Sequence, residues 1–216
     1  MELTQIQAVI FDMDGVLLDS ETISWKTWEI AAQERNLPDI GTVNALCMGA
    51  NRADTVNILK EHYGKDFDGY EFLDYCCTLF EKIEFSEGIP LMPYVKETLE
   101  YLKPKYKIAL ASSTREFKVR RQLKAAGIID YFETITTGDM VEHSKPFPDI
   151  YLKAAASIGV PAQNCIAVED SPNGVKSASS ANIRTIMIPD KIQPDEKIKA
   201  LCWKVTESLK NLKEFL

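Results

Sequence analysis

The stretch Ala8-Val9-Ile10-Phe11-Asp12-Met13-Asp14-Gly15 decides how the rest of this chain is interpreted. Its four apolar residues predict a short buried strand, which runs directly into two aspartates one residue apart. Carboxylates at the end of a buried strand cost free energy unless a cation or a reaction requires them there. Because side chains at i and i+2 of an extended segment share one side, Asp12 and Asp14 are expected to face the same small volume.

The composition limits the class of protein. The chain has 216 residues, of which 45% are hydrophobic, enough for one large core or for a core with an insertion. Lys and Arg total 25 against 32 for Asp and Glu, and the net charge is −7, without a basic block. This argues against nucleic acid as a partner. An acidic protein that binds an anionic substrate must gather positive charge locally.

The cysteines and the N-terminus indicate the compartment. Five cysteines, an odd number without zinc-type spacing, fit a reducing cytoplasm better than a disulfide framework. The first residues lack the basic region of a signal peptide, and no apolar run is long enough for a membrane span. We therefore expect a cytoplasmic protein without a membrane partner. A monomer is the default expectation for a single core.

Residues 17–87 are expected to form an all-helical block. Apolar periodicity predicts helices over 21–37, 42–49, 52–63 and 70–85, and no segment of the block favours a strand. Ser20 is expected to cap the first of these helices and Asn51 the third, which Gly64 ends. The block follows the paired aspartates directly. We therefore predict two domains, a core made of 1–16 and 88–216 and a helical lid made of 17–87.

Beyond residue 88 short apolar strands alternate with helices. Strands are predicted over 106–111, 132–136, 165–168 and 184–188, and helices over 94–102, 115–127, 148–159, 173–181 and 208–216. This alternation is typical of βαβ units around a buried parallel sheet. The predicted fold class is therefore α/β, a Rossmann-like doubly wound parallel sheet with an inserted helical domain.

Polar residues follow four of the predicted strands. Ligands of an open parallel sheet bind at the carboxyl ends of its strands. Asp12 and Asp14 follow the first strand, and the other three sets are Ser112-Ser113-Thr114-Arg115, Ser144-Lys145 and Glu169-Asp170. Together they predict a phosphate site with a divalent cation, Mg²⁺. Its expected acidic ligands are Asp12, Asp14, Glu169 and Asp170.

Phosphoryl chemistry gives these residues roles. Asp12 would attack phosphorus and form an aspartyl-phosphate, and Asp14 would act as general acid and base. Lys145 would offer a point charge to phosphate and nucleophile. Ser112 would hold phosphate oxygens at a helix start, together with Ser113, Thr114 and Arg115.

Each set taken alone has a simpler explanation. An EF-hand calcium loop is excluded, since Val16 occupies the place of its third acidic residue. Residues 112–114 could be a helix N-cap, Lys145 a solvated surface lysine and Glu169-Asp170 a turn. Their joint occurrence in order at strand ends favours the functional interpretation.

The four sets resemble the motifs of the haloacid dehalogenase superfamily. The matching segments are Phe11-Asp12-Met13-Asp14-Gly15, Ser112-Ser113, Ser144-Lys145-Pro146 and Glu169-Asp170-Ser171. The helical block resembles the type 1 cap of that superfamily, and the chain is most similar to its β-phosphoglucomutase-like phosphatase branch. The resemblance implies a Rossmann-like core, Mg²⁺ and an aspartyl-phosphate on Asp12.

The chain departs from the mutases of that branch in its helical block. It has Ser24 where they have a histidine, and Tyr75-Cys76-Cys77 where they have a lysine. We therefore expect hydrolysis of a small phosphomonoester, with a sugar phosphate as the first candidate. A hexose-phosphate mutase is the alternative, and a non-catalytic binding protein on the same fold is a more distant one. Arg52 is a candidate substrate contact, or else a surface arginine.

Overall fold

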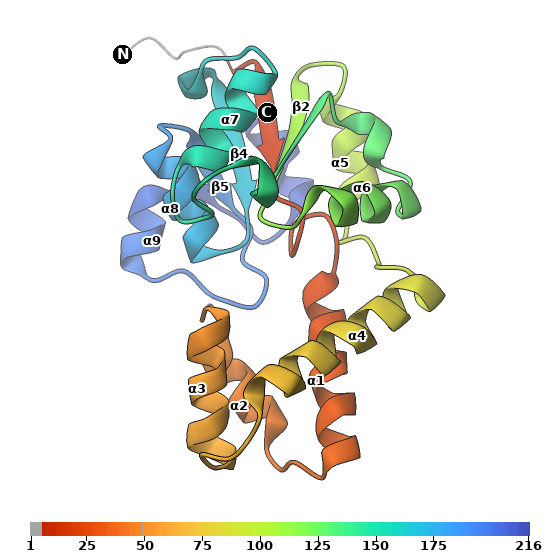
Figure 1. Cartoon of the computed structure of the whole chain (residues 1–216). Helices are drawn as coiled ribbons and strands as arrows, with labels where there is room; N and C mark the ends of the chain where they lie inside the picture. Colours follow the sequence, from red (N-terminus) through yellow and green to blue (C-terminus); the bar gives the residue numbers. More distant parts are fainter. Residues whose placement is uncertain (1–5, 49) are drawn as a thin grey trace. The chain divides into compact units, whose positions relative to one another are not determined.

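The computed structural model describes residues 6–48 and 50–216. Two sequence predictions concern residues outside these ranges. They are the prediction about signal-peptide features at the N-terminus and the end of the predicted helix at Gly49. The chain divides into two compact units, a core unit of Met1–Asp19 and Pro90–Leu216 and a helical unit of Ser20–Ile89 (Figure 1). Within the described ranges, no helix is both long and apolar enough to cross a bilayer.

A six-stranded parallel sheet forms the centre of the core unit. Its strand order is β3-β2-β1-β4-β5-β6. In β1 all four residues are buried, and Phe11 at its end lies beside Leu110 of β2 and Val168 of β4. The strands are β1 (Ala8–Phe11), β2 (Lys107–Ser112), β3 (Thr134–Thr137), β4 (Cys165–Glu169), β5 (Arg184–Met187) and β6 (Lys204–Val205). The predicted Rossmann-like α/β class is confirmed.

Helices cover both faces of this sheet. Figure 1 shows α5 and α6 on one side of the strands and α7, α8 and α9 on the other. On the second side Ile10, Ala167 and Tyr151 belong to one buried apolar cluster. The helices are α5 (Val95–Leu102), α6 (Glu116–Ala125), α7 (Asp149–Ser157), α8 (Pro172–Ser180) and α9 (Glu196–Leu201), and the 3₁₀ turns are η1 (Ile129–Tyr131), η2 (Gly138–Met140), η3 (Ala162–Asn164) and η4 (Leu209–Glu214).

The C-terminal part of the core unit differs from the sequence prediction. Neither α9 nor β6 was predicted, and the closing segment is a 3₁₀ turn within the range where an α-helix was expected. The strand β6 has only two residues, both exposed, so it lacks the apolar run that identifies a buried strand. Asn182 after α8 has a φ of 58°, the left-handed conformation that asparagine adopts more readily than other residues with a side chain.

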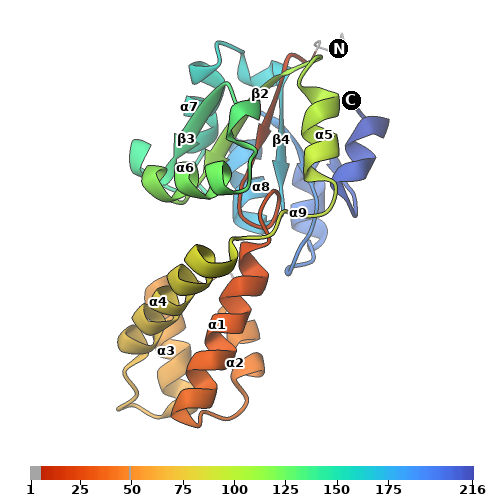
Figure 2. The same cartoon turned by 90° about the vertical axis from the view of Figure 1, so that its right-hand side faces the viewer.

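The helical unit has a core of its own. It consists of α1 (Ser20–Arg35), α2 (Ile40–Cys47), α3 (Arg52–Tyr63) and α4 (Gly69–Glu87) (Figure 2). The Trp28 and Phe72 rings meet edge to face, with centroids 5.2 Å apart. Asn51 caps α3 as predicted, since its side chain accepts a hydrogen bond from the Asp54 N–H. The predicted cap at Ser20 is wrong, because α1 begins at that residue.

The two chain segments that join the units are paired within the core unit. The Asp19 N–H donates to the Pro90 carbonyl at 2.9 Å, and the Met92 N–H donates to the Leu17 carbonyl at 3.0 Å. Residues 17–19 are therefore tied to the core unit, whereas the sequence placed the boundary before residue 17. These bonds hold the segment that follows β1 next to the segment with which the chain re-enters the core unit.

Candidate active site

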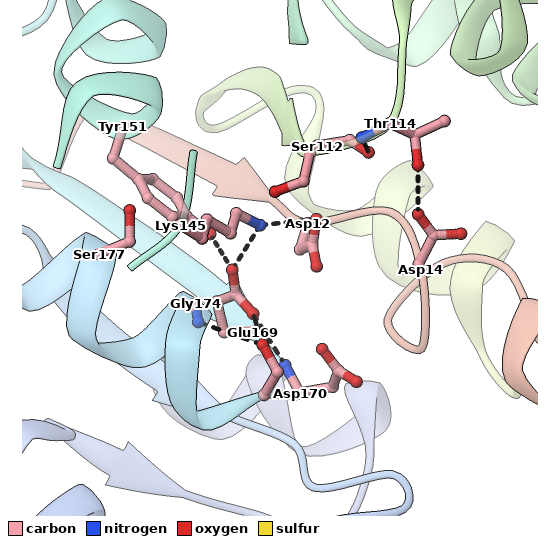
Figure 3. Close-up of polar contacts among 12 residues, drawn as sticks. Asp12, Asp14, Ser112, Thr114, Lys145, Tyr151, Glu169, Asp170, Gly174 and Ser177 are labelled. Carbon is pink, nitrogen blue, oxygen red and sulfur yellow. Dashed lines mark hydrogen bonds and ion pairs between the residues drawn. The ribbon is translucent and has the colours of Figure 1, made fainter. Parts of the chain in front are cut away.

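Four polar groups lie at the carboxyl edge of the sheet, around β1 and β4. Asp12 follows β1, Ser112 ends β2, and Glu169 ends β4 with Asp170 next to it (Figure 3). The connection from β1 leads towards β2 and that from β4 towards β5, so the strand order reverses between these neighbours. Such a reversal leaves a crevice beyond the strand ends, which is where open α/β sheets bind their ligands.

Lys145 lies between two buried carboxylates. Its Nζ is 2.8 Å from Asp12 Oδ1 and 2.7 Å from Glu169 Oε1, and only 7% of its side chain is exposed. Burial alone would lower the pKa of Lys145, but the charges of Asp12 and Glu169 outweigh burial and raise it. Burial raises the pKa of Asp12 to about 7, although Lys145 lowers it. We therefore treat Lys145 as a cation that is shared by two carboxyl groups.

The carboxylate of Glu169 is fully buried and is bonded through both oxygens. Oε1 accepts from Lys145 and from the Tyr151 hydroxyl, each at 2.7 Å. Oε2 accepts from the Asp170 N–H and from Ser171 Oγ, each at 3.3 Å. Burial and the charge of Glu169 raise the pKa of Tyr151 well above its usual value, so its hydroxyl stays a donor. Protein groups thus hold this carboxylate in one orientation.

Gly174 in the first turn of α8 packs directly against the Glu169 carboxylate. A Cβ atom at this position would overlap the carboxyl group. Ser171 caps the same helix, because its Oγ accepts from the Gly174 N–H at 3.1 Å. The glycine therefore allows the helix start to approach the buried carboxylate closely.

Asp12, Glu169 and Asp170 form an acidic group. One carboxylate oxygen from each lies within 4.8 Å of the others. Three carboxylates beside one lysine leave excess negative charge, and carboxylate oxygens are the ligands that Mg²⁺ prefers. The donor set therefore fits a divalent cation. Asp170 is partly exposed, so this side of the group is open to an ion.

Asp14 does not belong to this acidic group. Its Oδ2 accepts from the Thr114 hydroxyl at 3.0 Å (Figure 3). The backbone leaves the extended conformation after β1 and turns at Gly15, where φ is 72°. The charge of Asp14 still acts on Asp12 and helps to raise its pKa, after the larger effects of burial and Glu169.

The loop after β2 carries the other predicted phosphate residues. Ser112 is fully buried, and its Oγ accepts from the Thr114 N–H at 3.1 Å, so this N–H already has a protein partner. Ser113 Oγ accepts from the Ser144 hydroxyl at 3.1 Å, which joins the loop to the segment that carries Lys145. Arg115 is exposed before α6.

Gly138 and Asp139 hold this loop from the side of η2. The Gly138 N–H donates to the Thr114 carbonyl at 3.2 Å, and a Cβ at Gly138 would overlap the Ser113 carbonyl. Asp139 Oδ1 accepts from the Glu116 N–H at 3.0 Å and from the Thr137 hydroxyl at 2.6 Å. The Thr137 hydroxyl, then the Glu116 N–H and the charge of Arg115, lower the pKa of Asp139.

Comparison with known families decides where the chain belongs. A family model described as haloacid dehalogenase-like hydrolase matches residues 9–188, which include every motif of the site. The chain belongs to this family. The sequence resemblance is thereby confirmed.

Three relatives show what kinds of protein this haloacid dehalogenase-like hydrolase resembles. It is 34% identical over 182 residues to a phosphorylated carbohydrates phosphatase of Thermotoga maritima, covering 84% of each chain. It is 31% identical over 190 residues to hexitol phosphatase B of Escherichia coli K12, covering 86% of this chain and 84% of the relative. A Thermotoga maritima crystal structure, provisionally described as a β-phosphoglucomutase, matches with a TM-score of 0.80 and 31% identity over 98% of this chain and 100% of that chain.

The helical unit of this haloacid dehalogenase-like hydrolase holds the remaining predicted residue, Arg52. Its guanidinium lies 2.5 Å from Asp74 Oδ1 and 5.9 Å from the centre of the Tyr70 ring. The hydrogen bond from Arg52 to Asp74 raises the pKa of Arg52. The Arg52 side chain is exposed, and its charge is paired with that of Asp74.

Tyr151 and Gly174 were not predicted as site residues, and Ser171 was quoted only as part of the fourth motif, without a role of its own. Tyr151 lies six positions after Lys145 on the buried face of α7, beside Ile150 and Ala154. Periodicity marks such a tyrosine as part of the apolar core, and its hydroxyl is the only sequence signal that a polar partner is required.

Proposed function

We propose that this chain hydrolyses phosphomonoesters of small metabolites, with Asp12 as the nucleophile. The supporting observation is the position of Asp12 at the carboxyl edge of the sheet, paired with buried Lys145 and close to Asp170. The phosphatases among its relatives support the same reaction class. Two of them are named for phosphorylated carbohydrates and hexitols, and a sugar phosphate is our first candidate substrate.

In the first step a carboxylate oxygen of Asp12 attacks phosphorus, and the bond from phosphorus to the ester oxygen breaks. The departing alcohol takes a proton from the Asp14 carboxyl group, which the Thr114 hydroxyl orients. The product on the protein is an aspartyl-phosphate. Lys145 holds Asp12 in place and offsets negative charge on the phosphoryl group.

In the second step water attacks the phosphorus of the aspartyl-phosphate. Asp14, now a carboxylate, takes a proton from that water, and the bond between phosphorus and the Asp12 oxygen breaks. Inorganic phosphate leaves, and both aspartates return to their starting states. Ser112, Ser113 and Arg115 would bind the oxygens of the phosphoryl group.

We assign Mg²⁺ to the acidic group. Asp12 and Asp170 would hold the ion, with Glu169 adjacent to it. When bound, Mg²⁺ supplies positive charge that offsets the charge developing on the phosphoryl oxygens. We further propose that the helical unit selects the substrate, with Arg52 as an anion contact, and that the protein acts as a cytoplasmic monomer. All five cysteines are free, in agreement with a reducing compartment.

The test of the nucleophile is the Asp12→Asn variant. We expect Mg²⁺-dependent phosphate release from p-nitrophenyl phosphate to fall to background, because an amide cannot form the acyl phosphate. Asp66→Asn, which changes an exposed aspartate of the helical unit, is the matched control and should retain activity. Phosphate release by Asp12→Asn at the rate of the control would contradict the assignment.

The choice between hydrolysis and isomerisation requires product analysis. A panel of hexose, pentose and hexitol phosphates is incubated with Mg²⁺, and free phosphate and isomeric sugar phosphates are measured in the same samples. We expect free phosphate at the rate of substrate loss. An isomeric sugar phosphate without free phosphate would contradict hydrolysis and support a mutase.

A further inference from the structure

A buried tyrosine hydroxyl lies against the Glu169 member of the acidic group, and the mechanism above gives it no role. Tyr151 is fully buried in α7, and its hydroxyl donates to Glu169 Oε1 at 2.7 Å. Figure 3 shows the ring beside Lys145, with the hydroxyl directed at the carboxylate. The ring itself packs in an apolar cluster, where phenylalanine would fit equally well. The hydroxyl is therefore explained by the carboxylate rather than by packing.

Tyr151 shares its acceptor atom with Lys145. Oε1 of Glu169 receives both groups at 2.7 Å, while Lys145 Nζ also reaches Asp12 Oδ1 at 2.8 Å. A buried carboxylate oxygen that has a single donor attracts that donor strongly, because no other group offsets the charge on that oxygen. The Tyr151 hydroxyl, as a second donor to Oε1, weakens the attraction of Oε1 for Lys145. Lys145 can then remain shared with Asp12 instead of moving wholly to Glu169.

The surroundings keep Glu169 from adjusting to the loss of a donor. Its other oxygen is bonded to the Asp170 N–H and to Ser171, and Gly174 closes the space behind the carboxyl group. Lys145 Nζ also lies 5.3 Å from the centre of the Tyr151 ring, within the range of a cation–π contact. The hydroxyl and the ring of Tyr151 thus act on Glu169 and Lys145 separately.

We propose that Tyr151 is a positioning residue, whose hydroxyl bond to Glu169 holds Lys145 on the Asp12 carboxylate for phosphoryl transfer. This inference rests on the proposed function, because it assigns Tyr151 a part in the same reaction. The proposal distinguishes the effect of the Tyr151 ring from the effect of its hydroxyl. The ring contributes to the core, and the hydroxyl contributes to the rate.

The test is Tyr151→Phe, which keeps the ring and removes only the hydroxyl. The matched control is Tyr131→Phe, which removes a hydroxyl bonded to the Glu100 carboxylate at 3.3 Å on the exposed surface of the core unit. With p-nitrophenyl phosphate at saturating Mg²⁺, kcat of Tyr151→Phe should fall by about 10- to 100-fold, because a misplacement of about 1 Å in a group that acts on the reacting atoms can cost that much. KM and the Mg²⁺ concentration for half-maximal activity should change by less than about twofold, because neither substrate nor ion touches the hydroxyl. The control should match the wild type.

Two results would overturn the inference. A lower melting temperature with unchanged kcat would make Tyr151 a structural residue only. A higher Mg²⁺ requirement with full kcat at saturation would mean that the hydroxyl orients a metal ligand instead of Lys145. Failure of the proposed function would be visible separately, since the wild-type protein would then release no phosphate at all.

Discussion

Lys145 is a buried cation whose charge compensates two buried carboxylates. Asp12 and Glu169 both lie within 2.8 Å of its Nζ, and the three side chains are almost fully enclosed. A buried ion pair adds little net stability, but removal of one member leaves an uncompensated buried charge. Lys145, which we propose offsets charge on the phosphoryl group, therefore also stabilises the folded state of this site.

Lys145→Ala should lower the free energy of unfolding in the absence of Mg²⁺. We expect a loss of about 3–5 kcal/mol, measured by urea denaturation, because the variant leaves two buried carboxyl groups without their cation. Lys153→Ala changes an exposed lysine of α7 and is the control. Saturating Mg²⁺ should restore part of the loss, because an ion that binds only the folded state stabilises it. A loss no larger than that of the control would contradict the structural role of Lys145.

The predictability of the site differs from residue to residue. Asp12, Lys145 and Glu169 were predicted to lie together because each follows a strand, and parallel strands bring their carboxyl ends to one edge. The partner of Asp14 was not predictable, because it depends on the turn geometry beyond the strand. Tyr151 was missed for another reason. A buried residue that bonds a polar partner has the same apolar periodicity as a buried residue without one.

At the scale of elements, the turn after β1 depends on Gly15. Its φ of 72° lies in the left-handed region, and a Cβ there would overlap the Asp170 carboxylate. The turn therefore sets how closely the backbone after the nucleophile approaches a proposed Mg²⁺ ligand. A side chain at Gly15 would add backbone strain, because φ is positive, and a steric overlap with Asp170. A second glycine of the chain, Gly127, also has a positive φ but lies in open space, so a substitution there measures the strain alone.

Gly15→Ala should impair Mg²⁺ use more than stability alone explains. We expect the Mg²⁺ concentration for half-maximal phosphate release to rise by about 10- to 100-fold, because the new methyl group displaces Asp170. Gly127→Ala is the matched control, since Gly127 has a φ of 69° and open space where the Cβ would lie. Both variants should lose about 1–2 kcal/mol of stability to the left-handed backbone. An equal Mg²⁺ requirement in the two variants would contradict the steric explanation.

Elements were predictable where burial gave them a pattern. The helices 52–63 and 173–181 and the central strands were found within one or two residues, because apolar periodicity and caps define them. The strand β6 pairs with β5 at the edge of the sheet through exposed residues, and only the existing sheet specifies it. Ser20 has the residue type of a cap, but the helix begins at Ser20 itself.

At the scale of the whole molecule, each unit has a separate hydrophobic core. Phe72 is fully buried at the centre of the helical unit and contacts Trp28, whereas the core unit is built around its sheet. Units with separate cores can lose structure separately, because the buried surface of one does not depend on the other.

Phe72→Ala should therefore destabilise the helical unit selectively. We expect a cost of about 3–5 kcal/mol, the usual range for removing a buried phenylalanine ring. Hydrogen exchange followed by mass spectrometry should show faster exchange in α1–α4, while β1, β2 and β4 keep their protection. Phe85→Ala in the same helix is the control, because that side chain is 69% exposed. Equal loss of protection in the sheet would show that the two units unfold as one.

The paired segments at the base of the helical unit have a consequence for how substrate selection can change. Asp19 bonds to Pro90 and Leu17 to Met92, so the two ends of the insertion meet within the core unit. Seventy residues can be inserted there without altering the strands, because adjacent ends place no demand on the length of what lies between them. The reacting groups and the helical unit that we propose selects the substrate thus lie in separable segments of one chain. If the helical unit selects the substrate as proposed, we expect a helical unit from a relative, grafted between Asp19 and Pro90, to bring a new substrate preference to an unchanged set of reacting groups.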